Sequence, residues 1–234
     1  MKADGKSFLR FLEGADKQFV IPVYQRNYDW SKDQCEQLFN DIIEISQDGA
    51  RTHFIGSIVS IYHDDGKGQE YLIIDGQQRI TTLSILLLAL YRLLEDGQLS
   101  SKLIKQQIKE EYLVNKYSEE DKKVRLKPIK SDNEAFFKLF GKEENFIPDS
   151  NITNNYFYFT NRLKSMDVSV DNFFSALKRL MIVEIELKRG EDDPQLIFES
   201  LNSTGLSLTQ ADLVRNFILM KEHTDKQEDL YETY

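Results

Sequence analysis

The sequence predicts an α+β fold in which a mixed sheet core carries a large helical insertion and C-terminal helices. Residues 71–94 contain an apolar run, a short polar turn and a long apolar segment, which predict a strand, a turn and a buried helix. A strand-like run at 53–62 precedes this unit and predicts a hairpin. Residues 96–180 have the pattern of helices. The run MIVEIEL at 181–187 that follows them predicts a strand that rejoins the sheet.

We therefore divide the chain into three parts. They are a core at 1–95, a helical insertion at 96–180, and a last core strand with C-terminal helices at 181–234. A chain of 234 residues is long enough to bury one sizeable core, or one core with a helical extension.

The composition is that of an ordinary globular protein, with 41% hydrophobic and 29% charged residues. Cys35 is the single cysteine, so an internal disulfide is excluded and a reducing cytoplasm is the expected location. The chain opens without a secretory signal, and its longest apolar run, Ile85–Leu90, is far shorter than the roughly 20 residues of a membrane-spanning helix. We therefore expect neither export nor a membrane partner.

The net charge of −9 works against non-specific attraction to nucleic acid. It argues against strong duplex binding by this chain alone, although a local basic groove or another domain could still contact DNA. Lys122–Lys130 is the most basic stretch. It could touch a nucleic-acid backbone, but such a run is more often a solvated strand or loop.

The first expected elements are a short helix and a strand. Ser7–Leu12 carries paired apolar residues and predicts the helix. Gln18–Val23 predicts the strand, and Pro22 within it marks a sheet edge or a strand end because proline cannot donate a ladder hydrogen bond.

Residues 24–30, YQRNYDW, form a polar and aromatic loop, and loops between regular elements often carry ligand contacts. Arg26 could meet a phosphate. Tyr24, Tyr28 or Trp30 could stack on a base or close a pocket. Alternatively, Tyr28 and Trp30 fasten the next helix to the core.

The next helix is expected over Ser31–Ser46. Ser31 with Gln34 three residues later is a capping-box pattern, and the apolar residues that follow fall on one helical face. Cys35 lies inside this helix, where a buried thiol is expected rather than a reactive one.

The hairpin strand at 53–62 has two notable residues. Gly56 within a strand marks a bulge or a close backbone approach. His53 is expected to be structural, because the three histidines lack metal-ligand spacing and no zinc site is predicted.

The unit at 71–94 predicts an anion site. The strand Tyr71–Ile74 stops at Asp75-Gly76, and the apolar segment Ile80–Leu94 is too long for a single strand, so a helix begins at or just after the glutamines. The first turn of a helix leaves unpaired backbone N–H groups and carries about half a positive charge. A strand that feeds such a turn is therefore suited to bind an anion.

Side chains at this turn add to the site. Arg79 provides a cation with fork geometry for phosphate, and Gly76 lets a ligand approach the backbone. Gln77 and Gln78 can donate or accept hydrogen bonds, and Asp75 could hold a divalent metal or orient a water. Alternatively, the dipeptide at 75–76 is only a turn and the arginine pairs with an acid elsewhere.

Further helices are expected near 132–141, 152–166 and 171–180. A cap followed by proline at 193–194 predicts another helix start, and the turn at 202–205 ends that helix.

Three residues in this last part are candidate ligand contacts. Asn202 and Gly205 lie at the turn, and Asp212 lies near the start of the following helix. Asn202 and Gly205 could contact the same ligand. Alternatively, they are present because asparagine and glycine are the residue types that commonly end a helix.

Four sequence blocks carry a family resemblance. They are IPVYQRNYDW, HFIGSIV, DGQQRITTL and IFESLNSTGLSLTQADLVRNFIL, in this order between residues 21 and 219. Together they resemble the N-terminal domain of the GmrSD-type (type IV) restriction endonucleases of bacterial anti-phage systems. The resemblance implies a ParB/sulfiredoxin-like fold, with 1–95 as the ParB-like core. The region 96–180 carries no matching block.

The resemblance also implies NTP-dependent restriction of phage or modified DNA, and a C-terminal His-Asn-His-type nuclease domain that the residues of this chain do not supply. We therefore expect this chain to be an N-terminal fragment. The predicted function is binding and hydrolysis of a nucleoside triphosphate with Mg²⁺, controlling that nuclease, with DNA contacted through the full-length protein. A conventional P-loop is absent.

The candidate residues follow from these arguments. Expected catalytic residues are Asp75, Gln77, Gln78 and Arg79, with Asp75 also the metal ligand. Expected cofactor-binding residues are Tyr24, Gln25, Arg26, Gly76, Asn202, Gly205 and Asp212.

Two other functions stay open. The first is a non-catalytic DNA-binding or modified-base-sensing module in which the same pocket grips a nucleic-acid phosphate or base. The second is sulfiredoxin-like redox chemistry, which requires a thiol at the site. Cys35 in an amphipathic helix is poorly placed for that role.

Overall fold

The computed structural model describes residues 1–49, 51–64, 68–102, 105–116, 118, 123–188, 191–192 and 197. The expected C-terminal helices, and with them Asn202, Gly205 and Asp212, lie outside the described residues.

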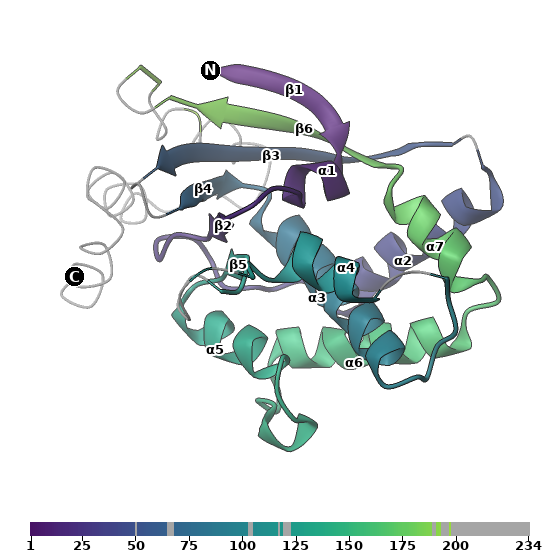
Figure 1. The fold of residues 1–234 in the computed structure, drawn as a ribbon. Coiled ribbons are helices and arrows are strands. Elements are labelled where there is room, and N and C mark those ends of the chain that lie inside the picture. Colours follow the sequence, from purple (N-terminus) through teal and green to yellow (C-terminus); the bar gives the residue numbers. More distant parts are fainter. Residues whose placement is uncertain are drawn as a thin grey trace.

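The described residues form a six-stranded mixed sheet (Figure 1). Its strands are β1 (Lys2–Ser7), β2 (Lys17–Val20), β3 (His53–Asp64), β4 (Gln69–Asp75), β5 (Leu126–Lys127) and β6 (Leu180–Leu187). They lie in the order β1-β6-β3-β4-β2-β5. β3 and β4 form the expected antiparallel hairpin, and β6 enters the sheet between β1 and β3, parallel to β3. The α+β class and the return of the last strand to the sheet are therefore confirmed.

The helices of the described region pack against one face of this sheet (Figure 1). They are α1 (Phe8–Leu12), α2 (Lys32–Gln47), α3 (Gln77–Glu95), α4 (Lys105–Ile108), the π-helix η1 (Lys109–Leu113), α5 (Lys130–Lys138), the 3₁₀ helix η3 (Glu143–Asn145), α6 (Asn151–Ser165) and α7 (Val170–Leu177). The capping box at Ser31 and Gln34 forms as expected.

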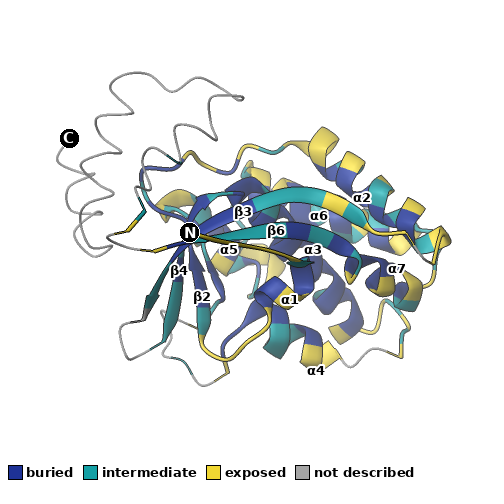
Figure 2. Ribbon diagram, turned by 90° about the horizontal axis from the view of Figure 1, so that it is seen from above, coloured by how far each residue is buried: buried dark blue, intermediate teal, exposed yellow. Residues whose placement is uncertain are grey.

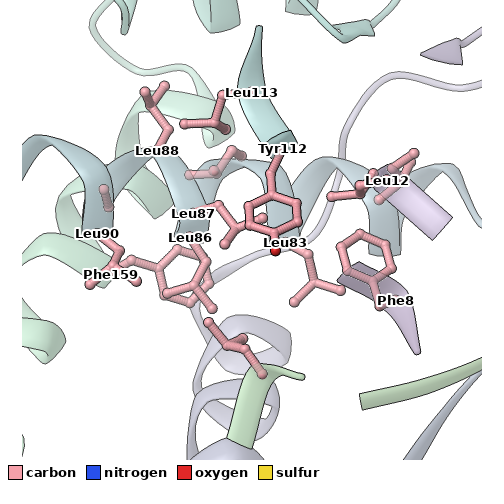
Figure 3. Close-up of a cluster of buried hydrophobic side chains, with 14 of the residues drawn as sticks. Phe8, Leu12, Leu83, Leu86, Leu87, Leu88, Leu90, Tyr112, Leu113 and Phe159 are labelled. Atoms are coloured by element: carbon pink, nitrogen blue, oxygen red, sulfur yellow. The ribbon is translucent and has the colours of Figure 1, made fainter. Parts of the chain in front are cut away.

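The core surrounds α3, which is buried along nearly its whole length (Figure 2). A helix that is apolar on all sides must be covered on all sides. Figure 3 shows leucines of α3 packed with side chains of α1, η1 and α6. Residues 96–180 thus share one core with residues 1–95, and β5 from that region also pairs with β2. The three-part division of the chain itself stays a prediction, as does the ParB-like relationship.

Several expectations about element ends require correction. β1 was not foreseen, because its exposed sequence KADGKS has no apolar alternation. Pro22 lies beyond the end of β2, and β2 has a neighbour on both sides, so the proline marks a strand end and not a sheet edge. The helix expected from Asp132 begins two residues earlier, at Lys130. The helix expected to reach residue 180 ends at Leu177.

One residue of the basic run, Arg125, differs from both interpretations of that run, whereas Lys123 and Lys130 are exposed, as expected of a solvated strand or loop. Arg125 is only 4% exposed, and its guanidinium donates hydrogen bonds to the carbonyl oxygens of Leu12, Gly14 and Glu110. Burial lowers its pKa. This arginine ties the region before β5 to the end of α1, so it is neither solvated nor available to a nucleic-acid backbone.

The opposite face of the sheet carries a second, smaller apolar cluster. It consists of Val59, Ile61, Ile74 and Leu187, with Leu72, Ile185 and Ile197 packed against it.

No helix among the described residues is long and apolar enough to cross a membrane.

Candidate functional site

The candidate site is built on the elbow between β4 and α3. β4 ends at Asp75, and Gly76 turns the chain with φ of +92°, in the left-handed region. A Cβ at this position would lie 3.0 Å from the carbonyl oxygen of Ser57 and from Cγ1 of Ile58. Both the backbone angle and the close approach to β3 therefore require glycine here.

The N-terminus of α3 has no side-chain cap. α1, α2, α6 and α7 each follow a serine whose hydroxyl accepts a backbone N–H of the first turn. α3 instead follows Gly76, which offers no such acceptor. The first N–H groups of a helix lack intrahelical partners, and here they begin a helix of 19 residues. This elbow therefore retains the capacity to bind an anion.

Arg79 is held in a fixed position by β3. Its Nη2 donates to the carbonyl oxygen of Ser57 at 2.6 Å and to Oδ2 of Asp75 at 3.3 Å. Its Nε is buried and has no hydrogen-bond partner among the described residues. A Cβ on Gly56, where φ is +111°, would lie 3.0 Å from the guanidinium carbon. Gly56 thus makes room for the arginine.

Gly56 also lies where the pairing of β3 with β6 shifts register, between Phe54 and Ser57. The sequence predicted a bulge or a close backbone approach at this glycine, and the structure has both a register shift beside it and a guanidinium packed against its backbone. The sequence did not indicate that the group approaching it would be Arg79, which lies on another element.

The loop 24–30 brings a second guanidinium to the elbow. Nη1 of Arg26 donates to Oδ2 of Asp29 at 2.8 Å, and both side chains are about half exposed, at 50% and 48%. Because the ion pair lies at the surface, it leaves Arg26 able to change partner. Arg26 is therefore the adjustable cation of the site, whereas Arg79 is the fixed one.

Gln78 fastens this loop to α3. Its Oε1 accepts the backbone N–H groups of Asp29 at 3.0 Å and Trp30 at 3.4 Å, and its Nε2 donates to the carbonyl oxygen of Asn27 at 3.0 Å. Nε2 of Gln25 donates to the carbonyl oxygen of Ile74 at 2.9 Å. In this structure the amide of Gln78 therefore positions the loop.

Residues of the middle region hold the loop from the other side. Oδ2 of Asp132 accepts the backbone N–H of Tyr28 at 2.6 Å. Nδ2 of Asn155 donates to the hydroxyl of Tyr28 at 3.0 Å and to the carbonyl oxygen of Trp30 at 2.7 Å. The Tyr28 hydroxyl lies 2.7 Å from Oγ1 of Thr82 on α3. Tyr28 thus fastens the loop to the core, as one of the two alternatives predicted.

Neither Asp132 nor Asn155 was predicted from the sequence as a residue that supports the site. They lie more than 100 residues from the loop that they hold, and the spacing of polar residues along a helix does not reveal such a partner.

A pocket of about 110 Å³ lies between the loop and the elbow. Its lining consists of Gln25, Arg26, Trp30, Ile74, Asp75, Gly76, Gln77, Gln78 and Arg79. We call it the elbow pocket. The structure thus brings together seven of the candidate residues identified in the sequence.

Gln77 is the most informative residue of this lining. It is only 8% exposed, and its side-chain oxygen is buried without a hydrogen-bond partner in the described part of the chain. A buried acceptor without a partner is costly, so a hydrogen-bond donor that entered the pocket beside it would relieve that cost.

Tyr24 does not line the elbow pocket. Its ring is buried, burial raises the pKa of its hydroxyl, and the hydroxyl has no partner among the described residues.

The model of the GmrSD restriction endonuclease N-terminal domain matches residues 8–219. The chain belongs to this family. The match includes residues 96–180, where no sequence block resembled the family. No curated protein sequence matches this chain.

Asp75 is the carboxylate that lines the elbow pocket of this GmrSD N-terminal domain, and the described residues offer it few companions as metal ligands. Among the described residues, no group of three or more histidine, cysteine, aspartate and glutamate side chains could hold a metal ion. A Mg²⁺ ion often takes only one or two protein carboxylates and fills its shell with waters and substrate phosphates. Asp75 fits that pattern, because Arg79 contacts one of its carboxylate oxygens, Oδ2, and the side chain lines the elbow pocket.

The thiol of this GmrSD domain lies inside the core. Cys35 is fully buried, its sulfur lies 3.7 Å from the Tyr28 hydroxyl, and burial raises its pKa to about 11. The thiol is therefore protonated near neutral pH, which disfavours nucleophilic chemistry. Cys35 does not line the elbow pocket.

Proposed function

We propose that this domain binds a nucleoside triphosphate with its phosphates in the elbow pocket, hydrolyses it, and thereby controls a nuclease that acts on DNA. The observation that carries the proposal is the convergence of two guanidinium groups, from Arg26 and Arg79, on an uncapped helix N-terminus. Membership of a restriction endonuclease family supports the link to DNA and to a nuclease domain.

The site offers the hydrogen-bond donors that a polyphosphate requires. The first-turn N–H groups of α3 favour negative charge through both hydrogen bonds and the helix dipole. Arg79 uses Nη2 for its bonds to Ser57 and Asp75, and Arg26 uses Nη1 for its bond to Asp29, so each retains further donors for phosphate oxygens. These donors would neutralise charge locally in a chain whose net charge is −9.

Hydrolysis of a phosphoanhydride depends mainly on positioning and on stabilisation of charge. Arg79 is already oriented by Ser57 and Asp75, so it loses little freedom when it stabilises the charge that develops on the phosphates. The unpaired oxygen of Gln77 can accept a hydrogen bond from the attacking water and orient it. A Mg²⁺ ion held by Asp75 would supply further neutralisation of the phosphate oxygens.

The test is phosphate release from ATP, GTP, CTP and UTP with Mg²⁺, measured on the full-length protein that contains this domain. At least one triphosphate should be hydrolysed, and Arg79→Ala should lower the rate by about 10²-fold or more. Arg51→Ala is the control, because Arg51 is also a partly exposed arginine paired with a carboxylate, that of Glu44, and it does not line the elbow pocket. The control should leave the rate unchanged.

The same experiment separates this proposal from the binding-module alternative. No release from any triphosphate, together with DNA binding that Arg79→Ala weakens, would mean that the pocket grips a nucleic-acid phosphate and is not catalytic. Equal rates for Arg79→Ala and the unmodified protein would place the hydrolysis elsewhere.

A further inference from the structure

A second pocket lies on the other side of Arg79. It has a volume of about 240 Å³ and lies between α2, the beginning of β3 and α3. Arg79 and Trp30 line both this pocket and the elbow pocket, so the two adjoin through these side chains. We call it the side pocket. If the charged end of a molecule occupied the elbow pocket, the rest of that molecule would extend into the side pocket.

The side pocket presents aromatic surface that the core does not use. Phe54 lines it and is 61% exposed, which is rare for a large apolar side chain in the described part of the chain. Trp30 is partly buried, and its backbone is held by Gln78 and Asn155. Two aromatic rings that line one pocket, one of them exposed, offer surface on which a flat aromatic group can stack.

Polar groups accompany these rings. Oδ2 of Asp41 lies 3.4 Å from Nε2 of His53, and Gln37 lines the same pocket. A carboxylate, an imidazole and an amide can accept and donate hydrogen bonds to the edge of a base or to ribose hydroxyls. Small-molecule sites typically combine apolar walls with a few polar groups of this kind. The volumes of the two pockets together fall near the lower end of the range of about 300–1,000 Å³ for such sites.

We infer that the side pocket binds the nucleoside of the nucleotide, its base against Phe54 and Trp30 and its polar edge or ribose toward Asp41 and His53. This inference rests on the proposed function, because it requires phosphates in the elbow pocket. Arg79 then lies between the two parts of one ligand, and Gly56 leaves the space that this position needs.

The test compares binding of nucleoside triphosphates with binding of inorganic tripolyphosphate, each with Mg²⁺, by calorimetry on the full-length protein. Phe54→Ala should weaken nucleotide binding by at least about 5-fold, because stacking of a base on an aromatic ring contributes about 1–3 kcal/mol, and it should leave tripolyphosphate binding unchanged. Arg79→Ala should weaken both. Phe137→Ala is the matched control, since Phe137 on α5 is 53% exposed and does not line the side pocket.

A second variant, Asp41→Asn, removes the carboxylate charge without a change of size and should also weaken only the nucleotide. If Phe54→Ala and Asp41→Asn both leave nucleotide affinity unchanged while Arg79→Ala reduces it, the side pocket does not hold the nucleoside, although the proposed function stands. Equal affinity of the unmodified protein for nucleotide and tripolyphosphate would also overturn the inference. Binding of neither ligand to the unmodified protein would overturn the proposed function and this inference together.

Discussion

The two arginines of the elbow pocket differ in how firmly the surrounding protein holds them. Arg79 is anchored to the carbonyl oxygen of Ser57 and to Asp75, whereas Arg26 lies half exposed in a local ion pair with Asp29. Surface ion pairs contribute about 0–1 kcal/mol to stability, so the Arg26 side chain adds little to the fold. Its charge-assisted hydrogen bonds to a phosphate, in contrast, would be worth about 1.5–3 kcal/mol.

Arg26→Ala should therefore separate binding from stability. We expect nucleotide affinity to fall by about 10-fold or more while the free energy of unfolding changes by less than about 0.5 kcal/mol. Calorimetry and denaturant titration measure the two quantities. Arg51→Ala, at 47% exposure against 50% for Arg26, should change neither. Unchanged affinity in the Arg26 variant would remove this residue from the site.

Cys35 provides a second test at this scale. Burial raises the pKa of its thiol to about 11, and only the thiolate reacts with disulfide reagents. Labelling of the native protein at pH 8 should therefore be slow, and unfolding in denaturant should make it fast. The pKa of this thiol is higher in the folded protein than in the unfolded chain. The contribution of this thiol to the free energy of unfolding should therefore keep its full value below about pH 9 and fall as the pH rises from about 9 toward 11.

Rapid stoichiometric labelling of the native protein at pH 8 would show that the thiol is exposed and ionised. It would reopen the redox interpretation of this chain.

Among the elements, the loop 24–30 has its geometry set by helices that are distant in sequence. Asn155 on α6 is only 2% exposed and holds both the Tyr28 hydroxyl and the Trp30 carbonyl oxygen, although it does not line the elbow pocket. This arrangement gives the middle region a role at the site: it fixes the loop that carries Arg26.

Asn155→Ala should loosen the loop. Removal of one partner leaves buried polar groups unsatisfied, so we expect a loss of about 1–3 kcal/mol in the free energy of unfolding, together with weaker nucleotide binding. Thr153→Val on the same helix is the control. Thr153 is equally buried, but its hydroxyl has no hydrogen-bond partner among the described residues, so its replacement should preserve stability and affinity.

If Asn155→Ala binds nucleotide as tightly as the unmodified domain under conditions where both are folded, the loop does not depend on α6. The middle region would then contribute only to the core.

Local patterns allowed several elements to be predicted from the sequence. The capping box at Ser31 begins α2, and the apolar run after Gly76 forms α3, because caps, turns and periodicity act over a few residues. β1 and β5 were not predictable in this way. β1 is charged and exposed, and β5 has two residues, so both depend on pairing with distant strands.

The same limit applies to the site. The elbow and its arginine could be read from adjacent residues of one segment. The hydrogen bond from Arg79 to the carbonyl oxygen of Ser57 joins residues 22 positions apart, and the hydrogen bond from Asn155 to the carbonyl oxygen of Trp30 joins residues 125 positions apart. Such contacts are set by tertiary packing, and a single sequence does not contain them.

At the scale of the whole molecule, α3 connects stability with function. Its N-terminus forms the elbow pocket, while its middle is the centre of the hydrophobic core between the sheet and the other helices (Figure 3). Because the helix is covered on all sides, the position of its first turn is fixed by core packing along its length. Under the proposed function, the first-turn N–H groups of α3 and Arg79 are therefore held in place before a ligand arrives, whereas Arg26 can adjust.

Leu86→Ala tests this dependence on the core. Leu86 is fully buried, and a buried leucine replaced by alanine typically costs about 2–5 kcal/mol in the free energy of unfolding because a cavity remains. Denaturant titration should show a loss in this range. Phe137→Ala, at an exposed position, should cost less than about 1 kcal/mol. A loss below 1 kcal/mol for Leu86→Ala would contradict the central place of α3 in the core.

The most direct test of the whole account is a density map of the protein with a non-hydrolysable nucleoside triphosphate and Mg²⁺. The account predicts phosphate density in the elbow pocket, within hydrogen-bond distance of Arg26, Arg79 and the first-turn N–H groups of α3. A triphosphate bound elsewhere, with the elbow pocket unchanged and Arg79 still paired only with Ser57 and Asp75, would contradict it.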